Sequence, residues 1–475
     1  MNKNIFFFPT HATSLAKFLD LAPKLLNKNY SFYFVVANQY VFDQKHRIES
    51  LGFNVIKLGE YKKKALRDGK ESVGINSDEY GYIKKIITKF VRLLFWMNIT
   101  TNFKEVLFEW RFKRKLLKEY KHKQKQVLEM LNNIKPDLLI VADDRCLGYQ
   151  CILQYEVKKN GCKIIIPPIS TFSDPVKIAE NRKKNNPFCI LMKPRKIKKN
   201  LLQQYITLET GEIITFYDTR IISVLSKLSY LPCNPWVLGA SLCDVVMVNG
   251  QYERKRLINY GMDERKVIVT GDPELDLLFE MNKEKTSIRE CLYKEHSFDS
   301  DQKLMVLALP QLYEHKIVDF QTHWTIIYFI LNEIEKHKVN LLISLHPKMK
   351  LEDYSFLEEK YNLSISKKPL RDIISTADIY IASQSSSTWF WSVALEIPCI
   401  LTNWYDMNYE LENKDCGVFE ARLEKEFSNE LNRIINNPKY YKSLCRKQKI
   451  QSQNIVMFDG NSVNNISKVI TSHLS

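Results

Sequence analysis

The chain has 475 residues, of which 45% are hydrophobic and 12% aromatic, so it is globular rather than disordered and long enough for two or three domains. Its 70 Lys and Arg residues against 54 Asp and Glu give a formal net charge of +16, which favours polyanionic partners: nucleotides, nucleic acid or an anionic membrane face. The ten cysteines show neither C-x-x-C nor zinc-ligand spacing, so we expect reduced thiols in a cytoplasmic protein.

Short apolar runs alternate with helical patterns through the first half of the chain. The first run is interrupted by Pro9 and His11, which makes it too short for a signal peptide, and no run of about 18 residues predicts a transmembrane helix. Near-continuous apolar runs are typical of strands buried on both faces of a parallel sheet. The predicted strands are 4–8, 31–37, 54–58, 137–142 and 163–167, with helices at 14–27 and 43–51.

The same alternation restarts after a proline-containing boundary at 231–237 and predicts a second sheet of the same type. Its predicted strands are 244–250, 266–271, 303–310, 339–347, 361–366, 378–383 and 397–402, with a helix at about 322–337. The fold class is therefore α/β, with two doubly wound halves.

Two basic segments do not fit either sheet. Residues 84–125 are basic, aromatic and helical in pattern, and an insertion at 181–215 opens with a loop over 181–200 that begins at Arg182. These segments are either solvated faces or sites of attachment to anionic lipid, with Phe95 and Trp96 as interfacial anchors. No nucleic-acid motif accompanies the charge, so nucleic acid is not expected as a partner.

Ligands of open α/β sheets bind beyond the carboxyl ends of the strands. In the second half, four strand ends carry polar groups suited to a phosphorylated ligand: Gly271; Gln311, followed by Tyr313, Glu314 and His315; His346, Pro347 and Lys348; and Ser385, Ser386, Ser387 and Thr388. The serine run is predicted to open a helix, whose N-terminus attracts phosphate, and His346 would add a charge-assisted hydrogen bond. The alternative is simple N-capping within a polar loop.

The order of three short motifs resembles the C-terminal half of GT-B glycosyltransferases of capsule and lipopolysaccharide assembly. The motifs are G-D-P-x-x-D at 271–276, L-H-P-K at 345–348 and S-S-S-T with I-P-C-I over 385–400, and the resemblance covers about residues 240–470. It is greatest to sialyl and Kdo transferases, whose HP and serine motifs bind the phosphate and ribose of a CMP-sugar.

This resemblance implies two Rossmann-like domains facing an interdomain cleft. The expected domains are an acceptor domain at 1–235, a nucleotide-sugar-binding domain at 236–440, and C-terminal helices at 441–475 that cross back to the first domain.

In those enzymes a carboxylate of the N-terminal domain is the general base. Asp143 and Asp144 directly follow a predicted strand. The sequence departs from the family pattern at the next position, where Arg145 replaces a glycine. Arg145 would hold one aspartate ionised and leave the other as base. The alternative is that the aspartates cap the next helix. His11 is a rival base, an acceptor-positioning group, or a plain loop histidine.

The sequence thus predicts a metal-independent transferase without a cofactor. It would move a sugar from a nucleotide-activated donor, with a CMP-sugar favoured, to a surface glycan or lipid-linked glycan, in the cytoplasm or peripherally at the inner membrane. The alternatives are an isomerase like UDP-N-acetylglucosamine 2-epimerase, a CDP-polyol phosphotransferase of teichoic acid type, and a non-catalytic polyanion-binding protein of the same fold.

Overall fold

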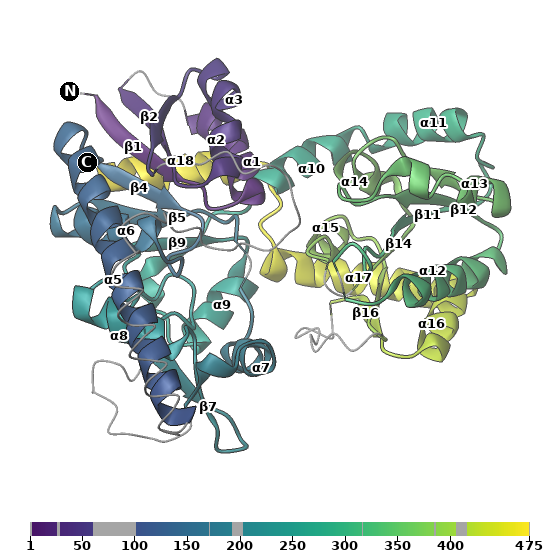
Figure 1. The fold of residues 1–475 in the computed structure, drawn as a ribbon. Helices are drawn as coiled ribbons and strands as arrows, with labels where there is room; N and C mark the ends of the chain where they lie inside the picture. The colour runs from purple at the N-terminus through teal and green to yellow at the C-terminus, as the bar shows by residue number, and fades with distance from the viewer. Residues whose placement is uncertain are drawn as a thin grey trace. The chain divides into compact units, whose positions relative to one another are not determined.

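The computed structural model describes residues 2–25, 29–59, 101–170, 172–191, 203–315, 317–383, 386–404 and 416–474. Two large sheets, each flanked by helices, dominate the fold (Figure 1). All ten cysteines are free thiols, as expected. No helix in the described ranges is long and apolar enough to cross a membrane.

The first sheet has seven strands in the order β10-β9-β5-β4-β1-β2-β3. The order reverses between β1 and β4, which run parallel to each other, so the loops after these two strands lie at a topological switch point. The strands are β1 (Lys3–Phe8), β2 (Tyr30–Val36), β3 (Asn54–Lys57), β4 (Leu138–Val141), β5 (Lys163–Ile166), β9 (Val245–Val248) and β10 (Val267–Val269).

Strands β9 and β10 correct one prediction. The sequence places 244–250 and 266–271 in the second sheet, but β9 pairs with β5 and with β10 in the first. The reason is that all four residues of β9 are buried, and a short apolar run of this kind fits the interior of any parallel sheet. Which strand β9 pairs with depends on how the chain connects the strands, and hydrophobic periodicity does not reveal that connection.

The second sheet has six parallel strands in the order β13-β12-β11-β14-β15-β16, with its reversal between β11 and β14. Both orders are those of doubly wound, Rossmann-like sheets, as predicted. The strands are β11 (Lys303–Ala308), β12 (Val339–Ser344), β13 (Ser364–Ile365), β14 (Ile379–Ser383), β15 (Cys399–Thr402) and β16 (Val418–Ala421).

Helices follow most strands. Those up to residue 259 are α1 (Ala12–Leu21), η1 (Ala22–Leu25), α2 (Gln39–Asp43), α3 (Lys45–Ser50), α5 (Thr101–Asn133), α6 (Tyr149–Lys159), α7 (Pro175–Asn185), η2 (Pro187–Cys189), α8 (Thr219–Leu228) and α9 (Gln251–Asn259). The later ones are η4 (Glu264–Lys266), α10 (Pro273–Lys283), α11 (Lys285–His296), α12 (Phe320–Glu335), η5 (Leu351–Asp353), α13 (Leu357–Lys360), α14 (Leu370–Ile373), η6 (Ile374–Thr376), α15 (Trp389–Ala394), α16 (Glu424–Asn436), α17 (Pro438–Ile455) and α18 (Ser462–Leu474).

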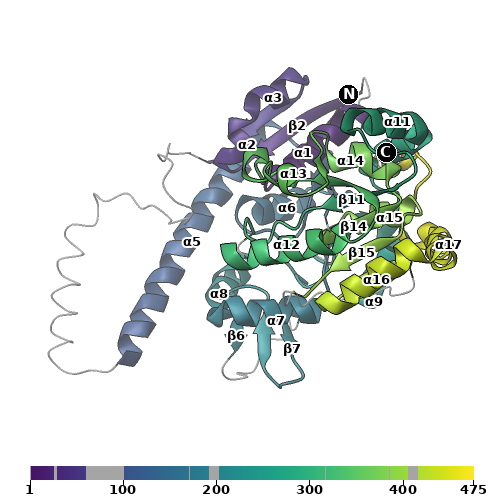
Figure 2. The ribbon, with the colours of Figure 1, turned by 90° about the vertical axis from the view of Figure 1, so that its right-hand side faces the viewer.

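The core of the second sheet lies on both of its faces. Met305 and Leu307 of β11 pack into one apolar cluster with α12 and α16, which run beside the strands in Figure 2. Leu304 and Val306 pack into a second cluster with α10 and α11. Because successive strand residues point to opposite faces, the uninterrupted apolar run of β11 fills both cores.

The insertion is more ordered than predicted. The expected loop over 181–200 instead contains the end of α7, the short helix η2 and strand β6 (Ile190–Leu191); residues 192–202 lie outside the described ranges. Strand β6 joins β7 (Tyr205–Thr207) and β8 (Ile213–Thr215) in a small antiparallel sheet. Of the basic segment 84–125, residues 101–125 belong to α5, while Phe95 and Trp96 lie outside the described residues.

Candidate functional site

The C-terminal edge of the second sheet carries the most chemistry. The loop after β12 turns sharply at His346, whose carbonyl accepts from the Met349 N–H at 2.8 Å while its Nδ1 accepts from the Lys348 N–H at 3.2 Å. Because Nδ1 is an acceptor, the proton of a neutral His346 ring sits on Nε2. His346 is half-buried and Pro347 and Lys348 are exposed, so this turn presents an N–H donor and an ammonium group.

The loop after β11 brings a second imidazole to the same place. Its turn is closed by the His315 N–H donating to the Gln311 carbonyl at 3.1 Å. The His315 and His346 rings then lie 5.5 Å apart edge to face, and the Lys348 ammonium lies 3.3 Å from His315 Nε2. We call His315, His346 and Lys348 the basic cluster.

The pKa values of the two imidazoles of the basic cluster lie below the ordinary value of a histidine. Burial lowers the pKa of His346, and the neighbouring His315 and Lys348 lower it further. Burial and then Lys348 likewise lower the pKa of His315, while Glu314 acts in the opposite direction on both rings. A bound anion would offset the repulsion between these groups, so the cluster is built to accept negative charge.

A buried chain of side chains lies behind the basic cluster. The Tyr354 hydroxyl donates to the Glu314 carboxylate, and His323 Nε2 lies 3.0 Å from the Tyr354 oxygen. His323 is 1% exposed, and burial lowers its pKa. The chain therefore fixes Glu314, and with it the turn that carries His315.

The serine run is used differently from the prediction. Helix α15 has only six residues, and its N-cap Thr388 makes no side-chain capping bond. Instead the hydroxyls of Ser386 and Thr388 lie 2.6 Å apart, and that of Thr388 also bonds the phenol of Tyr380 from β14. Ser387 is the exposed hydroxyl of the run, and Ser385 lies outside the described residues. The alternative, simple N-capping, is not supported at Thr388, while phosphate binding by these hydroxyls stays a prediction.

Gly271 has a packing role in the structure. Its φ is +79°, and a Cβ there would lie 2.3 Å from the Ser462 hydroxyl. Asp276, from the same motif, accepts from the Ser462 and Val463 N–H groups at 2.9 and 3.0 Å and so caps α18. The motif G-D-P-x-x-D therefore holds the C-terminal helix. Its role in nucleotide binding stays a prediction, as does that of Gln311, which is half-buried at the β11 end.

The switch point of the first sheet carries the predicted catalytic residues. His11 is exposed and caps α1, because its Nδ1 accepts from the Ser14 N–H at 3.1 Å. A neutral His11 consequently carries its proton on Nε2 and presents a donor, which suits the positioning of an acceptor better than the removal of its proton.

Asp143 and Asp144 follow β4, which pairs with β1. Arg145 binds both carboxylate oxygens of Asp143, with Nε at 2.8 Å from one and Nη2 at 2.5 Å from the other. Asp143 is half-buried, whereas Asp144 is 0% exposed. The predicted division, in which Arg145 holds one aspartate and leaves the other as base, does not fit this geometry: Arg145 holds Asp143, and Asp143 is also the carboxylate that reaches the surface. The role of general base stays a prediction.

Among the residues around the basic cluster, Glu314 and His315 belong to a strand end that the sequence indicates, whereas Tyr354 was not selected. Glu314 and His315 were visible as polar residues after β11, but their distance from the strand end gave no sign that the turn folds back on His346. Tyr354 carried no signal because it comes from a loop with no motif. Among the described residues, no group of three or more His, Cys, Asp or Glu side chains is arranged to hold a metal ion.

Residues 238–472 match the family model described as CDP-Glycerol:Poly(glycerophosphate) glycerophosphotransferase. The matched range contains the second sheet, the basic cluster and the C-terminal helices. No curated protein matches the chain by sequence.

Solved structures are similar over the full length of the chain. The UDP-GlcNAc 2-epimerase of Neisseria meningitidis bound to UDP-GlcNAc is 13% identical, with a TM-score of 0.51 over 100% of this chain and 99% of that one. The calicheamicin glycosyltransferase CalG4 is 10% identical, with a TM-score of 0.53 over 100% and 98% of the chains. The spinosyn forosaminyltransferase SpnP is 11% identical, with a TM-score of 0.51 over 100% of both.

These similarities confirm the predicted fold, a GT-B arrangement of two Rossmann-like domains. Together with the family match, they support a transferase. The predicted relation to CMP-sugar transferases stays a prediction.

Proposed function

We propose that the protein is a transferase that binds the phosphate groups of a cytidine-nucleotide donor at the basic cluster and moves a polyol phosphate to a surface-glycan acceptor. The observation that carries the proposal is the convergence of His315, His346 and Lys348 at one edge of the second sheet, inside the range that matches the glycerophosphotransferase family. That family's description names CDP-glycerol, which favours a CDP-linked polyol over a CMP-sugar as donor.

The reaction assigns a role to each half of the molecule. The acceptor hydroxyl oxygen would bond to the phosphorus of the polyol phosphate, the bond from that phosphorus to the oxygen of CMP would break, and CMP would leave. His346 Nε2–H and the Lys348 ammonium would donate to the phosphate oxygens and stabilise the charge on departing CMP. Asp143, oriented by Arg145, would take the hydroxyl proton, while His11 would position the acceptor.

Glycosyl transfer from a CMP-sugar is the second candidate. The glycosyltransferase fold and the order of the HP and serine motifs favour it. Both reactions release CMP, but the first makes a phosphodiester and the second a glycoside, so phosphorus analysis of the product separates them.

A calorimetric panel of CMP, CDP, UDP and GDP tests the nucleotide site. We expect cytidine nucleotides to bind best, with CDP about tenfold tighter than CMP because its second phosphate adds charge-assisted hydrogen bonds. Absence of binding by all four at millimolar concentration would refute the site.

Attachment to an anionic membrane is proposed for the helical part of the basic segment. On α5, Phe108 is 62% and Trp110 is 53% exposed, and lysines and arginines surround them in the sequence. Exposed aromatic and basic side chains on one helix suit an anionic lipid surface. Sedimentation with phosphatidylglycerol vesicles at low salt tests this, and a protein that stays in the supernatant would contradict it.

A further inference from the structure

Arg182 differs from the other half-buried or buried arginines in its lack of a carboxylate partner. Within the described ranges, the guanidinium groups of five such arginines each bind a carboxylate: Arg145 with Asp143, Arg220 with Asp218, Arg254 with Glu264, Arg289 with Asp378, and Arg371 with Asp372. A sixth, Arg256, acts on the buried Glu253: burial raises the pKa of that carboxyl to about 7, and Arg256 opposes the rise. Arg182 forms no ion pair with any described carboxylate.

The surroundings of Arg182 leave its charge unmatched. Its guanidinium lies 4.0 Å from the centre of the Phe216 ring, which occupies one face, and the Cys189 thiol lies close enough to act on its pKa. Burial raises the pKa of that thiol, so Cys189 stays neutral and does not balance the charge. Burial also lowers the pKa of Arg182, with a further contribution from the like charge of Arg145.

Arg182 also lies near Arg145, the partner of the proposed catalytic carboxylate Asp143. The Arg145 guanidinium shares the Phe216 ring at 5.9 Å, and the Tyr217 hydroxyl donates to the Arg145 carbonyl at 2.5 Å. Arg145 is bound by Asp143 and is also stabilised by the buried Asp144, whereas neither carboxylate forms an ion pair with Arg182. A desolvated cation without a partner is costly, and such groups in proteins usually have an anion to bind.

We propose that Arg182 is the binding site for an oxyanion of the acceptor, a phosphate or a carboxylate group. The edge of a guanidinium that stacks on an aromatic ring remains free to bind such a group through two parallel hydrogen bonds. The assignment to the acceptor rests on the proposed function, because Asp143 is the base there. The oxyanion site itself rests only on the surroundings of Arg182.

The test uses inorganic phosphate and the full chain in a H346A/K348M background, which weakens phosphate binding at the basic cluster. Calorimetry measures phosphate affinity in this background and in the same background carrying R182Q, R182K or K184Q. K184Q is the control, because Lys184 is an exposed residue of the same helix. We expect R182Q to weaken phosphate binding at least about tenfold, R182K to weaken it less because the planar fork is lost but the charge stays, and K184Q to leave it unchanged. Equal phosphate affinity with and without R182Q would overturn the proposal.

Two further arms separate the site from folding and from lipid. Measured without phosphate, the Tm of the background protein should change little on R182Q, because removal of an unpaired charge offsets the loss of the contact with Phe216. A lower Tm with phosphate binding intact would make Arg182 structural and overturn the proposal. Acetate in place of phosphate distinguishes a carboxylate from a phosphate site. Loss of vesicle sedimentation in R182Q with phosphate binding retained would reassign Arg182 to lipid and overturn the acceptor role.

The proposed function can fail independently. CDP titrated into the wild type and into R182Q should give one affinity, since the donor binds on the second sheet. If CDP binds neither protein while R182Q still abolishes phosphate binding in the background variant, the proposed function fails and the oxyanion site stands.

Discussion

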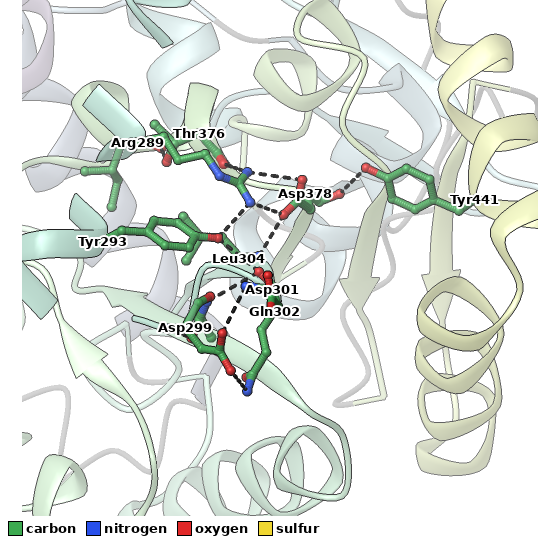
Figure 3. A network of polar contacts seen from close by, with 11 residues as sticks. Arg289, Tyr293, Asp299, Asp301, Gln302, Leu304, Thr376, Asp378 and Tyr441 are labelled. Carbon is green, nitrogen blue, oxygen red and sulfur yellow. Dashed lines mark hydrogen bonds and ion pairs between the residues drawn. The ribbon is translucent and has the colours of Figure 1, made fainter. Parts of the chain in front are cut away.

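The two ends of the second sheet are built in opposite ways. At the N-terminal end, Arg289 binds the Asp378 carboxylate at 2.7 and 3.1 Å and the Thr376 carbonyl at 2.8 Å, and the Leu304 N–H donates to Asp378 at 2.7 Å (Figure 3). The Tyr441 hydroxyl donates to the Asp378 carbonyl at 3.0 Å. In this network each cation faces a carboxylate, as stability requires.

At the C-terminal end, three basic groups meet without such a match. Lys348 faces an imidazole nitrogen of His315, and the two imidazoles face each other. Lowered imidazole pKa values and an ammonium group that forms no ion pair with a described carboxylate do not stabilise the fold, so we infer that this end is shaped by what it binds. The comparison indicates that the N-terminal end of this sheet stabilises the fold and the C-terminal end binds a ligand. Substitutions at the first end should therefore change stability, and substitutions at the second should change ligand affinity.

Asp378→Ala should give the largest effect on stability. It removes the partner of Arg289 and the acceptor for Leu304 N–H, so we expect a loss of about 3 kcal/mol in the free energy of unfolding. Urea denaturation measures the loss, and CDP affinity of the folded fraction should be unchanged. An equal loss of CDP affinity would mean that the two ends are not separable.

His346→Ala should have the opposite effects: weaker CDP binding with little change in the free energy of unfolding. It removes an N–H donor from the basic cluster, and we expect CDP to bind about thirtyfold more weakly, which corresponds to about 2 kcal/mol. The free energy of unfolding should hardly change, because the ring's one hydrogen bond is to the Lys348 N–H beside it. Calorimetry and urea denaturation of the same sample provide both values. A destabilised variant with normal CDP affinity would assign His346 to the fold.

A change of pH should alter CDP affinity less than the substitution His346→Ala does. Burial and neighbouring charge lower the pKa values of His315 and His346 in the free protein, and a bound phosphate raises them, so binding takes up protons. CDP affinity should therefore increase about threefold to tenfold from pH 8 to pH 6. His346→Ala should flatten this dependence. An affinity that falls toward pH 6 would contradict the cluster's role.

Lys348→Met should have the smallest effect. Lys348 is exposed, so its loss should weaken CDP binding only about threefold and reduce the salt dependence of binding. Lys350→Met, at an exposed lysine two positions further on, serves as the matched control. Equal effects of the two substitutions would show that net charge, rather than the basic cluster, attracts the nucleotide.

Much of the fold was predictable because buried parallel strands leave long apolar runs in the sequence. The runs of β11, β12 and β14 fix these strands and so place His346 and the serine run at strand ends. The sheet to which β9 belongs was not predictable, because an apolar run records burial but not its partner.

The site was predictable in part for a similar reason. A residue directly after a strand, such as His346, has its position fixed by the strand. His315 lies further along a loop whose turn depends on the buried pair of Glu314 and Tyr354, and Gly271 packs on Ser462 from the far end of the chain. Contacts between residues distant in sequence leave no local pattern, so these roles required the structure.

The most direct test of the central claim is to follow the imidazole signals of His315 and His346 by NMR while CDP is added. If the basic cluster binds the donor phosphates, both signals shift with the calorimetric affinity and both pKa values rise in the complex. If CDP binds and neither imidazole changes in shift or in pKa, the nucleotide lies elsewhere and the account is wrong.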